Sequence, residues 1–398
     1  MNDRAHGEAS AGNLGRRDQS SWQVRAIQNV GYEVRLLDGL FDSANKAFLD
    51  ACCPAGGASR HVVVIDERVH ELHGARIRRY YQCHGIDLHT LVLPVSEEVK
   101  EMDVALEILR HFEREGVLRR SEPVIAIGGG VLLDLVGFAA GLYRRGIPYI
   151  KVPTNAMALW DAAVGIKTGI NAMGRRNRLG SYHPPLRSLL DRTFLRTVER
   201  RDLSNGMGEL LKLAVIKDAR LFDLLERHGR MLLDTAFQDG IVAPEVISRA
   251  VHGMLEELAP NLWETTLERS VDFGHSFAPL LEMRALPELL HGEAVALDVL
   301  LSCRIAAQRG LMTMAQTHRV LAVMQAMELP LDHRFFGDPE MLQEALADTM
   351  RHRDGMQRLP IPAGIGACTF INDLRPDEIR AAAREMAGAP SEALACTA

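Results

Sequence analysis

The 398-residue sequence lacks several features that would assign it directly to a class of protein. It has six cysteines and no CxxC pair, which predicts reduced thiols in a cytoplasmic protein and no disulfide framework. No apolar run approaches the roughly 20 residues that a membrane-spanning helix needs. The N-terminus is polar and Gly-rich without an apolar core, so we do not expect a secretory signal there.

An excess of positive charge is also missing. The formal net charge is −6 and no region concentrates Lys and Arg, which argues against a nucleic-acid-binding surface. A small anion could still be held by a few local cations. Hydrophobic residues make up 47% of the chain and charged residues 25%, as in ordinary globular proteins, and the length is sufficient for two packed domains.

The first half of the chain alternates short β-branched runs with helical patterns. The runs are HVVVID (61–66), LHTLVLP (88–94), PVIAIGGG (123–130) and PYIKVP (148–153). Each is apolar without alternation, which is typical of a parallel strand buried on both faces. A helical repeat of apolar residues fills the segment between the second and third runs, and Gly116 is placed to end it. This order predicts a doubly wound α/β sheet.

After about Pro185 the sequence becomes rich in Leu, Ala, Glu and Arg, and strand-like runs nearly disappear. We therefore expect a disordered arm over residues 1–20, an α/β domain over 21–190 and a mostly helical domain over 191–398. The last residues, from about Gly388, are expected to be a loose end. A cleft between the two domains is the default place for an active site.

Three consecutive glycines follow a predicted strand in IAIGGGVLLDLVGF (125–138). Glycines let a backbone approach a pyrophosphate, and free N–H groups at a helix start stabilise its charge. The spacing is not GxGxxG, so a tight turn without a ligand explains the segment equally well. Asp66, at the end of the first predicted strand, could accept hydrogen bonds from a ribose or could cap a turn.

Charged residues in three further segments have both a functional and an ordinary explanation. Glu97 and Lys100 stand three apart at a predicted helix start, where a solvated pair is common. Asp161 and Lys167 are commonplace loop residues, but the small residues around them would let a ligand come close. RRNRLGSYHPP (175–185) groups cations that suit a phosphate, or forms a solvated basic loop.

Glu209 and two histidines, His275 and His291, are candidate metal ligands. Glu209 lies in a predicted helix with Lys212 one turn later, and each histidine stands beside a glycine. One Glu and two His with an open position are typical of a catalytic zinc site. However, the three residues are scattered along the chain, and a lone helical histidine is more often a core or surface residue. Spacing by itself does not decide between these explanations.

Read together, these segments resemble the sugar phosphate cyclases, the superfamily of 3-dehydroquinate synthase. The resemblance runs from about Trp22 to Arg380. It rests on motifs that stand in the family's order: PVIAIGGGVLLDLVGF, YRRGIPYIKVPT, DAAVGIKTGIN, NRLGSYHPP, GELLK, DFGHSF and LLHGEAVALD. The resemblance implies an N-terminal NAD-binding α/β domain, a helical metal-binding domain and a homodimer.

The resemblance also implies a role for each matching residue. A divalent metal, zinc or cobalt, would be held by Glu209, His275 and His291. NAD would be contacted by Asp66, Glu97, Lys100, Gly129, Gly130 and Asp134. The substrate would be faced by Asp161, Lys167, Asn177, Lys212, Arg269 and Asp272, of which Asp161, Lys167 and Asn177 would also adjoin NAD. The phosphate of the substrate would be gripped by Arg145 and Arg176.

Departures from dehydroquinate synthase indicate a particular branch of the superfamily. There the first metal-histidine motif resembles NFGHTFGH, whereas here Asp272 and Pro279 replace the asparagine and the second histidine. These changes, together with LYRRG, NRLGSYHPP, LPLDH (329–333) and RHRDGMQRLPIP (351–362), resemble the 2-epi-5-epi-valiolone synthases, which act on sedoheptulose 7-phosphate. In that branch His333 would also face the substrate.

Two local departures leave the product open. PTNAM (153–157) and Trp160 stand where valiolone synthases typically show PTTL, and Arg176 replaces their usual Lys. Arginine keeps the charge but changes reach and geometry. A 2-epi-valiolone synthase or a desmethyl-4-deoxygadusol synthase therefore stays an alternative. Less favoured are a 3-dehydroquinate synthase, a metal-dependent polyol dehydrogenase and a non-catalytic binding protein on the same fold.

The reaction that the resemblance implies is a cyclisation that eliminates phosphate. NAD would take a hydride transiently, phosphate would leave beside the new ketone, the hydride would return, and an intramolecular aldol step would close the ring. We therefore expect a cytoplasmic lyase whose partner is a small sugar phosphate, with no nucleic acid or membrane involved.

Overall fold

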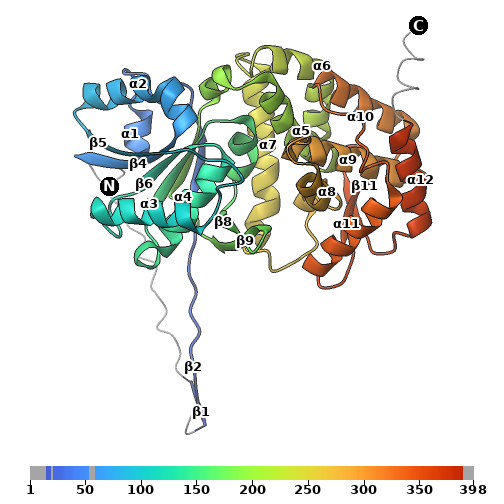
Figure 1. The fold of residues 1–398 in the computed structure, drawn as a ribbon, viewed down its shortest axis with the longest axis horizontal. Coiled ribbons are helices and arrows are strands. Elements are labelled where there is room, and N and C mark those ends of the chain that lie inside the picture. The colour runs from blue at the N-terminus through green and yellow to red at the C-terminus, as the bar shows by residue number, and fades with distance from the viewer. Residues whose placement is uncertain (1–14, 19–20, 53–58, 389–398) are drawn as a thin grey trace, which may run out of the picture.

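The computed structural model describes residues 15–18, 21–52 and 59–388, and its N-terminal half contains a six-stranded parallel sheet (Figure 1). The spatial order of the strands is β3-β10-β7-β6-β4-β5. Their bounds are β3 (Glu33–Leu36), β4 (Arg60–Asp66), β5 (Asp87–Leu93), β6 (Val124–Gly128), β7 (Tyr149–Pro153) and β10 (Arg187–Leu190). The chain moves from β4 outward to β5 and then returns to β6 on the other side of β4. This reversal is the point at which doubly wound sheets bind ligands.

The predicted strands and the doubly wound sheet are confirmed, because the four apolar runs form β4, β5, β6 and β7. Helices cover both faces: α1 (Ala47–Cys52) and α2 (Glu67–His84) lie on one, α3 (Met102–Arg114) and α4 (Gly130–Leu142) on the other (Figure 1). Within β4, Val63 and Ile65 pack into the core under α1 and α2, whereas Val62 and Val64 pack into the opposite core. This alternation explains why the run is apolar throughout.

The helix predicted before Gly116 is α3, and Gly116 follows it with a φ of +61°. It begins only at Met102, so Glu97 and Lys100 lie in the connection before it and not at its start. The interpretation of 175–185 as a basic loop is wrong, because most of this segment is a strand. β8 (Lys167–Ala172) and β9 (Arg175–Tyr182) form an antiparallel hairpin. The two turn residues, Met173 and Gly174, both have a positive φ, as is typical of the two-residue turns that connect hairpin strands.

The second half is mostly helical, as the sequence predicts. The long helices are α5 (Arg200–Ile216), α6 (Ala219–Asp234), α7 (Val242–Leu258), α8 (Ala278–Ala285), α9 (His291–Gln308), α10 (Met314–Ala326), α11 (Pro339–His352) and α12 (Pro376–Ala387). The shorter helical turns are η1 (Tyr143–Arg145), η2 (Ala158–Ala162), η3 (Arg192–Thr197), η4 (Ala259–Asn261) and η5 (Ser270–Asp272). One small hairpin, β11 (Leu359–Pro362) with β12 (Cys368–Ile371), interrupts the helices. None of the described helices combines the length and apolar character needed to cross a membrane.

Two glycines bring the central helices α5 and α9 into close contact. A Cβ on Gly208 would overlap the carbonyl group of Gly292, and a Cβ on Gly292 would overlap the carbonyl oxygen of Asn205. Any larger residue would therefore push the helices apart. Glu209 follows one glycine directly and His291 precedes the other, so this contact sets the distance between them.

The two chain ends fall largely outside the described residues. Of the arm predicted over 1–20, only Gly15–Asp18 is described, and it forms strand β1, which pairs with β2 (Ser21–Gln23). The hairpin projects away from the body of the molecule (Figure 1). The expected loose C-terminal end, 389–398, lies outside the described residues.

Candidate active site between the two halves

A cavity of about 640 Å³ lies between the sheet and the helical half. Its walls come from η2 and the β8–β9 hairpin on one side, and from α5, α7, η5 and the start of α9 on the other. The predicted site residues that line it are Asp134, Asp161, Lys167, Asn177, Lys212, Arg269, Asp272, His275 and His291. The fold thus gathers most of the predicted catalytic residues around one space.

Glu209, His275 and His291 meet at the helical wall of this cavity. The Nε2 atoms of His275 and His291 lie 3.5 Å and 3.4 Å from Oε1 of Glu209. One ligand atom from each residue lies within 4.8 Å of the others. Glu209 is fully buried, and one of its carboxylate oxygens forms an ion pair with Lys212. Because two imidazole nitrogens converge on its other oxygen, this set fits a divalent metal.

The protonation of the triad also suits a cation. Burial alone would raise the pKa of Glu209, but Lys212 and the two histidines lower it well below its usual range. Burial lowers the pKa of His275 to about 4, so its imidazole is neutral and can ligate. Burial opposes protonation of His291, yet its contacts with Glu209 and Glu282 raise its pKa to about 10.

Lys212 and Asp161 stand next to this triad. Lys212 is buried and forms an ion pair with Glu209. Burial would lower the pKa of Lys212, but Glu209 and Asp161 outweigh it and raise the pKa. Asp161, in η2, has its pKa raised by burial and by the charge of Glu209. A carboxyl group that holds a proton more readily, beside a buried ammonium, is suited to proton transfer.

Trp160 is explained by packing and not by the cavity. Its side chain is fully buried, its Nε1 donates to the carbonyl oxygen of Gly206 at 2.8 Å, and its ring centroid lies 5.0 Å from that of Phe237. Asn155, in the segment PTNAM, is the other residue that departs from the valiolone synthase pattern. It lies against the glycine turn, where a Cβ on Gly129 would overlap its side-chain amide. Of these two unusual residues, only Asn155 adjoins a predicted cofactor site.

Glu264 organises the cations at the outer part of the cavity. Its Oε1 lies 3.0 Å from Nζ of Lys167 and 2.7 Å from Nη1 of Arg269. The hydroxyl of Tyr182 donates to its other oxygen at 3.2 Å. Arg269 also lies 3.2 Å from Asp272. Glu264 is not among the residues predicted from the sequence, because a lone acidic residue in a loop carries no spacing signal.

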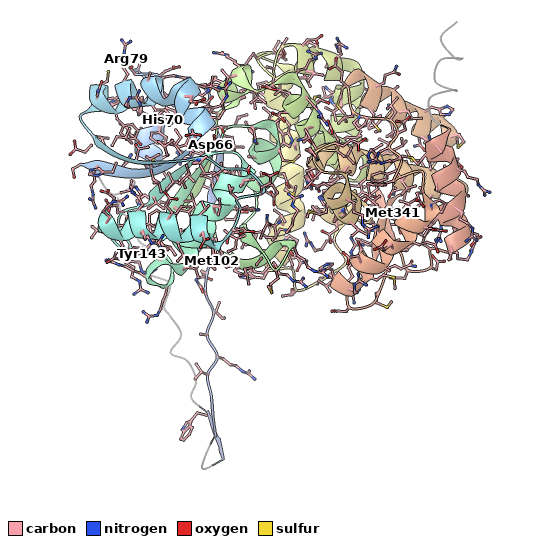
Figure 2. The ribbon with its side chains drawn as sticks, in the orientation of Figure 1. Asp66, His70, Arg79, Met102, Tyr143 and Met341 are labelled. Carbon is pink, nitrogen blue, oxygen red and sulfur yellow. The ribbon has the colours of Figure 1, made fainter. Side chains whose placement is uncertain are left out.

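The glycine turn forms the start of α4, the helix that brings Asp134 to the cavity. Among the described residues no side chain caps this helix, which leaves its first N–H groups available to an anion. Asp66 lies on the neighbouring strand, and its Cβ would touch a Cβ placed on Gly128 (Figure 2). Its carboxylate caps α2 by accepting from the N–H groups of Arg68 and Val69. The capping role is confirmed, and the contact with ribose stays a prediction.

Lys100 is not part of a solvated pair with Glu97, so that explanation is wrong. Its side chain is only 3% exposed, and its Nζ donates to Asp134 and to Asn177 at 2.6 Å each. Asn177 has a φ of +49° and contributes its side chain from β9. This network fixes β9 against α4 beside the glycine turn.

Nine predicted residues are absent from the described lining of the cavity: Glu209, the predicted NAD residues Asp66, Glu97, Lys100, Gly129 and Gly130, and three predicted substrate residues, Arg145, Arg176 and His333. Arg145 is exposed in η1 and is absent from the described lining. His333 has a buried side chain that packs against Phe335, with Nε2 3.8 Å from Glu288, also outside that lining. The guanidinium of Arg176 is held between two carboxylates, Glu97 and Glu282. A substrate role for these three residues stays a prediction.

Family models describe most of the chain. A model of the 3-dehydroquinate synthase N-terminal region matches residues 90–205, and a model of the C-terminal region matches residues 206–354. The chain belongs to the 3-dehydroquinate synthase family. The two family regions meet within α5, so the family's own division crosses the helix that carries Glu209.

Within this family, the chain is most usefully compared with three proteins. A 2-epi-5-epi-valiolone synthase from Actinoplanes sp. is 52% identical over 92% of this chain and 93% of its own length. A second is ValA, a 2-epi-5-epi-valiolone synthase from Streptomyces hygroscopicus subsp. jinggangensis 5008, whose structure was solved with NAD⁺ and Zn²⁺ bound. ValA is 47% identical to this chain, and the two structures match with a TM-score of 0.87 over 92% of this chain and 99% of that one. A demethyl-4-deoxygadusol synthase from Trichormus variabilis is 36% identical over 92% of this chain and 89% of its own.

Proposed function

We propose that this protein is a sugar phosphate cyclase that converts sedoheptulose 7-phosphate to 2-epi-5-epi-valiolone and releases phosphate. The observation that carries the proposal is the convergence of Glu209, which is buried, with His275 and His291, which line the same cavity as the candidate proton-transfer residues Lys212 and Asp161. Four relatives named for this product are 47–52% identical to the chain, whereas a demethyl-4-deoxygadusol synthase is 36% identical. The cofactors would be NAD and a divalent metal, zinc or cobalt, and the enzyme would be a lyase.

The side chains support the chemistry in distinct ways. When bound, a divalent metal would supply Lewis acidity at substrate hydroxyls, and NAD would supply a reversible hydride acceptor. Asp161, whose pKa is raised by burial, can accept and hold a proton beside the reacting carbons. Lys212 offers a buried positive charge to an oxygen anion that forms near Glu209.

The outer cations suit the departing phosphate. Glu264 holds Lys167 and Arg269 on the same side of the cavity, so two positive charges converge there. Their charges would stabilise the phosphate as its bond breaks. Asp272 is paired with Arg269 and faces the same space, where it can contact a sugar hydroxyl.

A single assay tests the proposal. The protein is supplied with sedoheptulose 7-phosphate, NAD and zinc, and phosphate release and absorbance of NADH are followed together. We expect phosphate without net NADH, because the hydride returns to the substrate. Net NADH without phosphate would identify a polyol dehydrogenase instead. The absence of both phosphate and NADH would contradict catalysis on this substrate.

NMR of the product separates the remaining alternatives. A 2-epi-5-epi-valiolone spectrum supports the proposal, whereas 2-epi-valiolone or demethyl-4-deoxygadusol would overturn the assigned product while leaving the cyclase class intact. Glu209→Ala, purified in the same way, is the matched negative control.

We further propose that the enzyme acts as a cytoplasmic homodimer. The support is the family resemblance together with cysteine usage typical of reduced proteins. Light scattering of the purified chain should give twice the mass of 44.0 kDa, and a monomer mass would contradict the dimer.

A further inference from the structure

A continuous chain of side chains connects the segment before α3 to one of the metal-ligand candidates. Nε of Arg176 donates to Oε1 of Glu97 at 3.0 Å, and Nη1 of Arg176 forms an ion pair with Oε1 of Glu282. The second oxygen of Glu282 contacts Nδ1 of His291 at 2.9 Å. The other ring nitrogen of His291 faces Glu209. The chain thus links the sheet half with the helical half.

Glu282 determines which nitrogen of His291 is free to ligate. Because its carboxylate occupies Nδ1, the imidazole presents Nε2 to Glu209. His275 is oriented in the same sense by a different acceptor, the carbonyl oxygen of Phe273, which lies 3.1 Å from Nδ1. An acceptor on the second nitrogen fixes the tautomer and the ring plane of a ligating histidine. Of the two histidines, only His291 depends on a side chain for this orientation.

Glu282 in turn depends on Arg176. Its side chain is only 5% exposed, and a buried carboxylate is stable only when its remaining oxygen is also paired. Arg176 supplies that pairing from β9 while a second nitrogen of the same guanidinium holds Glu97. Asn171 donates to the same carboxylate oxygen of Glu97 at 2.9 Å, which fixes the far end of the chain.

The planar fork of arginine is what allows this bridge. Two nitrogens of one guanidinium point to two carboxylates on opposite sides, whereas a lysine has a single ammonium at the end of its stem. The two carboxylates already balance the positive charge of Arg176, which weakens its attraction for a phosphate. This arrangement gives a physical reason for arginine at a position where lysine is usual in the valiolone synthases.

We propose that Arg176 is a positioning residue that holds Glu282 against His291, and so presents Nε2 of His291 to a divalent metal. This role replaces the phosphate contact suggested by the sequence. It also connects the metal-ligand set with Glu97, on the predicted NAD side of the cavity. The inference rests on the metal part of the proposed function.

Zinc affinity provides the test, measured without substrate or NAD by competition with a chromophoric zinc chelator. We expect Arg176→Met to bind zinc about 10-fold more weakly and Glu282→Ala about 10- to 100-fold more weakly, the range typical of lost partners of ligating histidines. Arg176→Lys should show an intermediate loss, since it keeps the charge but not the fork. Glu282→Gln keeps the shape of the side chain and guards against misfolding of the alanine variant.

Arg178→Met is the matched control, because Arg178 is an exposed arginine on the same strand, β9. Its zinc affinity should equal that of the unaltered protein. The double variant Arg176→Met/Glu282→Gln should lose less than the product of the two single losses, because both act through one contact. Multiplicative losses would contradict a shared chain of contacts.

Two outcomes overturn the inference without touching the proposed function. In the first, Arg176→Met keeps full zinc affinity, and its only defect is a raised KM for sedoheptulose 7-phosphate, as for a phosphate-binding residue. In the second, Glu282→Gln and Glu282→Ala both bind zinc normally. Conversely, if the unaltered protein binds zinc, the variants weaken it and no phosphate is released, the inference stands and the proposed function fails.

Discussion

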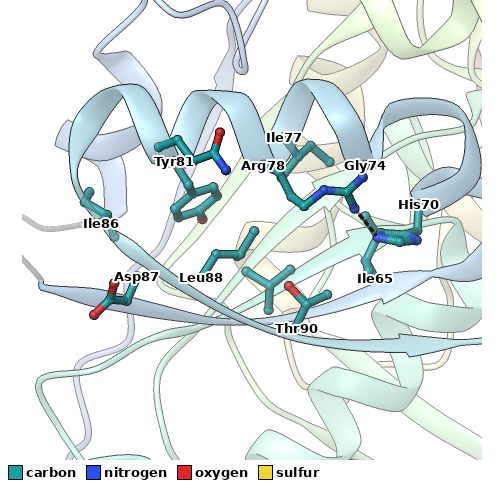
Figure 3. A pocket seen from close by; sticks show the side chains of 12 residues that line it. Ile65, His70, Gly74, Ile77, Arg78, Tyr81, Ile86, Asp87, Leu88 and Thr90 are labelled. Carbon is teal, nitrogen blue, oxygen red and sulfur yellow. Dashed lines mark hydrogen bonds between the residues drawn. The ribbon is translucent and has the colours of Figure 1, made fainter.

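Two hollows in this protein contain the same kinds of side chain but differ in how they are built. One is the cavity between the two halves. The other, of about 460 Å³, lies between α2 and β5 (Figure 3). There Arg78 reaches across Gly74 to His70, with Nη1 2.9 Å from Nε2, while Asp87 lies at the opposite end. Histidine, arginine and aspartate are thus present in both places.

The difference lies in burial and in the origin of the walls. The α2–β5 pocket is formed by neighbouring segments, β4, α2 and β5, and its charged residues Arg78 and Asp87 are exposed. The cavity between the halves draws on distant segments and buries Glu209 and Lys212 as an opposed pair. Polar composition alone therefore does not distinguish a reactive site. The feature that distinguishes a reactive site is the burial of opposed charges, because burial shifts their pKa values.

The largest expected effect tests this contrast directly. Glu209→Ala removes a ligand and leaves Lys212 buried without its partner, so we expect zinc binding to weaken at least about 100-fold and turnover to vanish. His70→Ala, the matched change in the α2–β5 pocket, should leave turnover within about twofold. Metal analysis and phosphate release measure both. Full metal occupancy in Glu209→Ala would refute the ligand assignment.

Glu264→Gln should have the next largest effect. The amide keeps the shape of the side chain but loses the charge that holds Lys167 and Arg269 together. We expect kcat/KM for sedoheptulose 7-phosphate to fall about 10- to 100-fold, which corresponds to a loss of about 1.4–2.7 kcal/mol of transition-state stabilisation. Steady-state kinetics measure this loss. An unchanged kcat/KM would mean that the cations are held by the rest of the cavity.

Asp272→Asn tests a single residue of the cavity at smaller cost. It restores the amide found in dehydroquinate synthase and weakens the pair with Arg269. Turnover should fall about tenfold, a loss of about 1.4 kcal/mol, while NAD affinity stays nearly constant, because Asp272 lies at the helical wall. Kinetics combined with NAD titration separate the two quantities. Equal losses in both would place Asp272 in cofactor binding.

The smallest effect on turnover concerns His61 on β4, whose Nδ1 lies 3.0 Å from the hydroxyl of Tyr81, a residue that lines the α2–β5 pocket. Burial lowers the pKa of His61 from 6.5 to about 4. Between these two values the unfolded chain takes up a proton that the folded chain resists. The free energy of unfolding should therefore decrease as the pH falls from about 6.5 to 4, by about 2–3 kcal/mol from this residue.

Urea unfolding at pH 7 and pH 5 checks this prediction. His61→Asn should lose less stability between the two pH values than the unaltered protein does. His252→Asn, at a histidine whose side chain is 76% exposed, should behave like the unaltered protein. If all three proteins lose the same stability between pH 7 and pH 5, His61 is not the titrating group. Turnover at pH 7 should be nearly unchanged in each variant.

The strands and the helical half could be predicted because their signals are local. β4, β6 and β7 are buried on both faces, so each appears as a mostly apolar run, and the partly buried edge strand β5 still has enough apolar residues to be recognised. The edge strand β3 and its neighbour β10 were missed, since each has four residues and no comparable run. The β8–β9 hairpin was missed because its turn, at Met173 and Gly174, lacks the usual Asn-Gly or Asp-Gly signal.

The candidate triad, the glycine turn and the family could be named from the sequence, because whole motifs stand in order. The position of Arg176 between two carboxylates, the burial of Trp160 in the core and the contacts of Glu264 with two cations became visible only in the folded chain. The reason is physical. Local periodicity records which face of an element is buried, but a charge acquires its partner only when distant segments pack together. In this protein that packing depends on the close contact of α5 and α9 at Gly208 and Gly292.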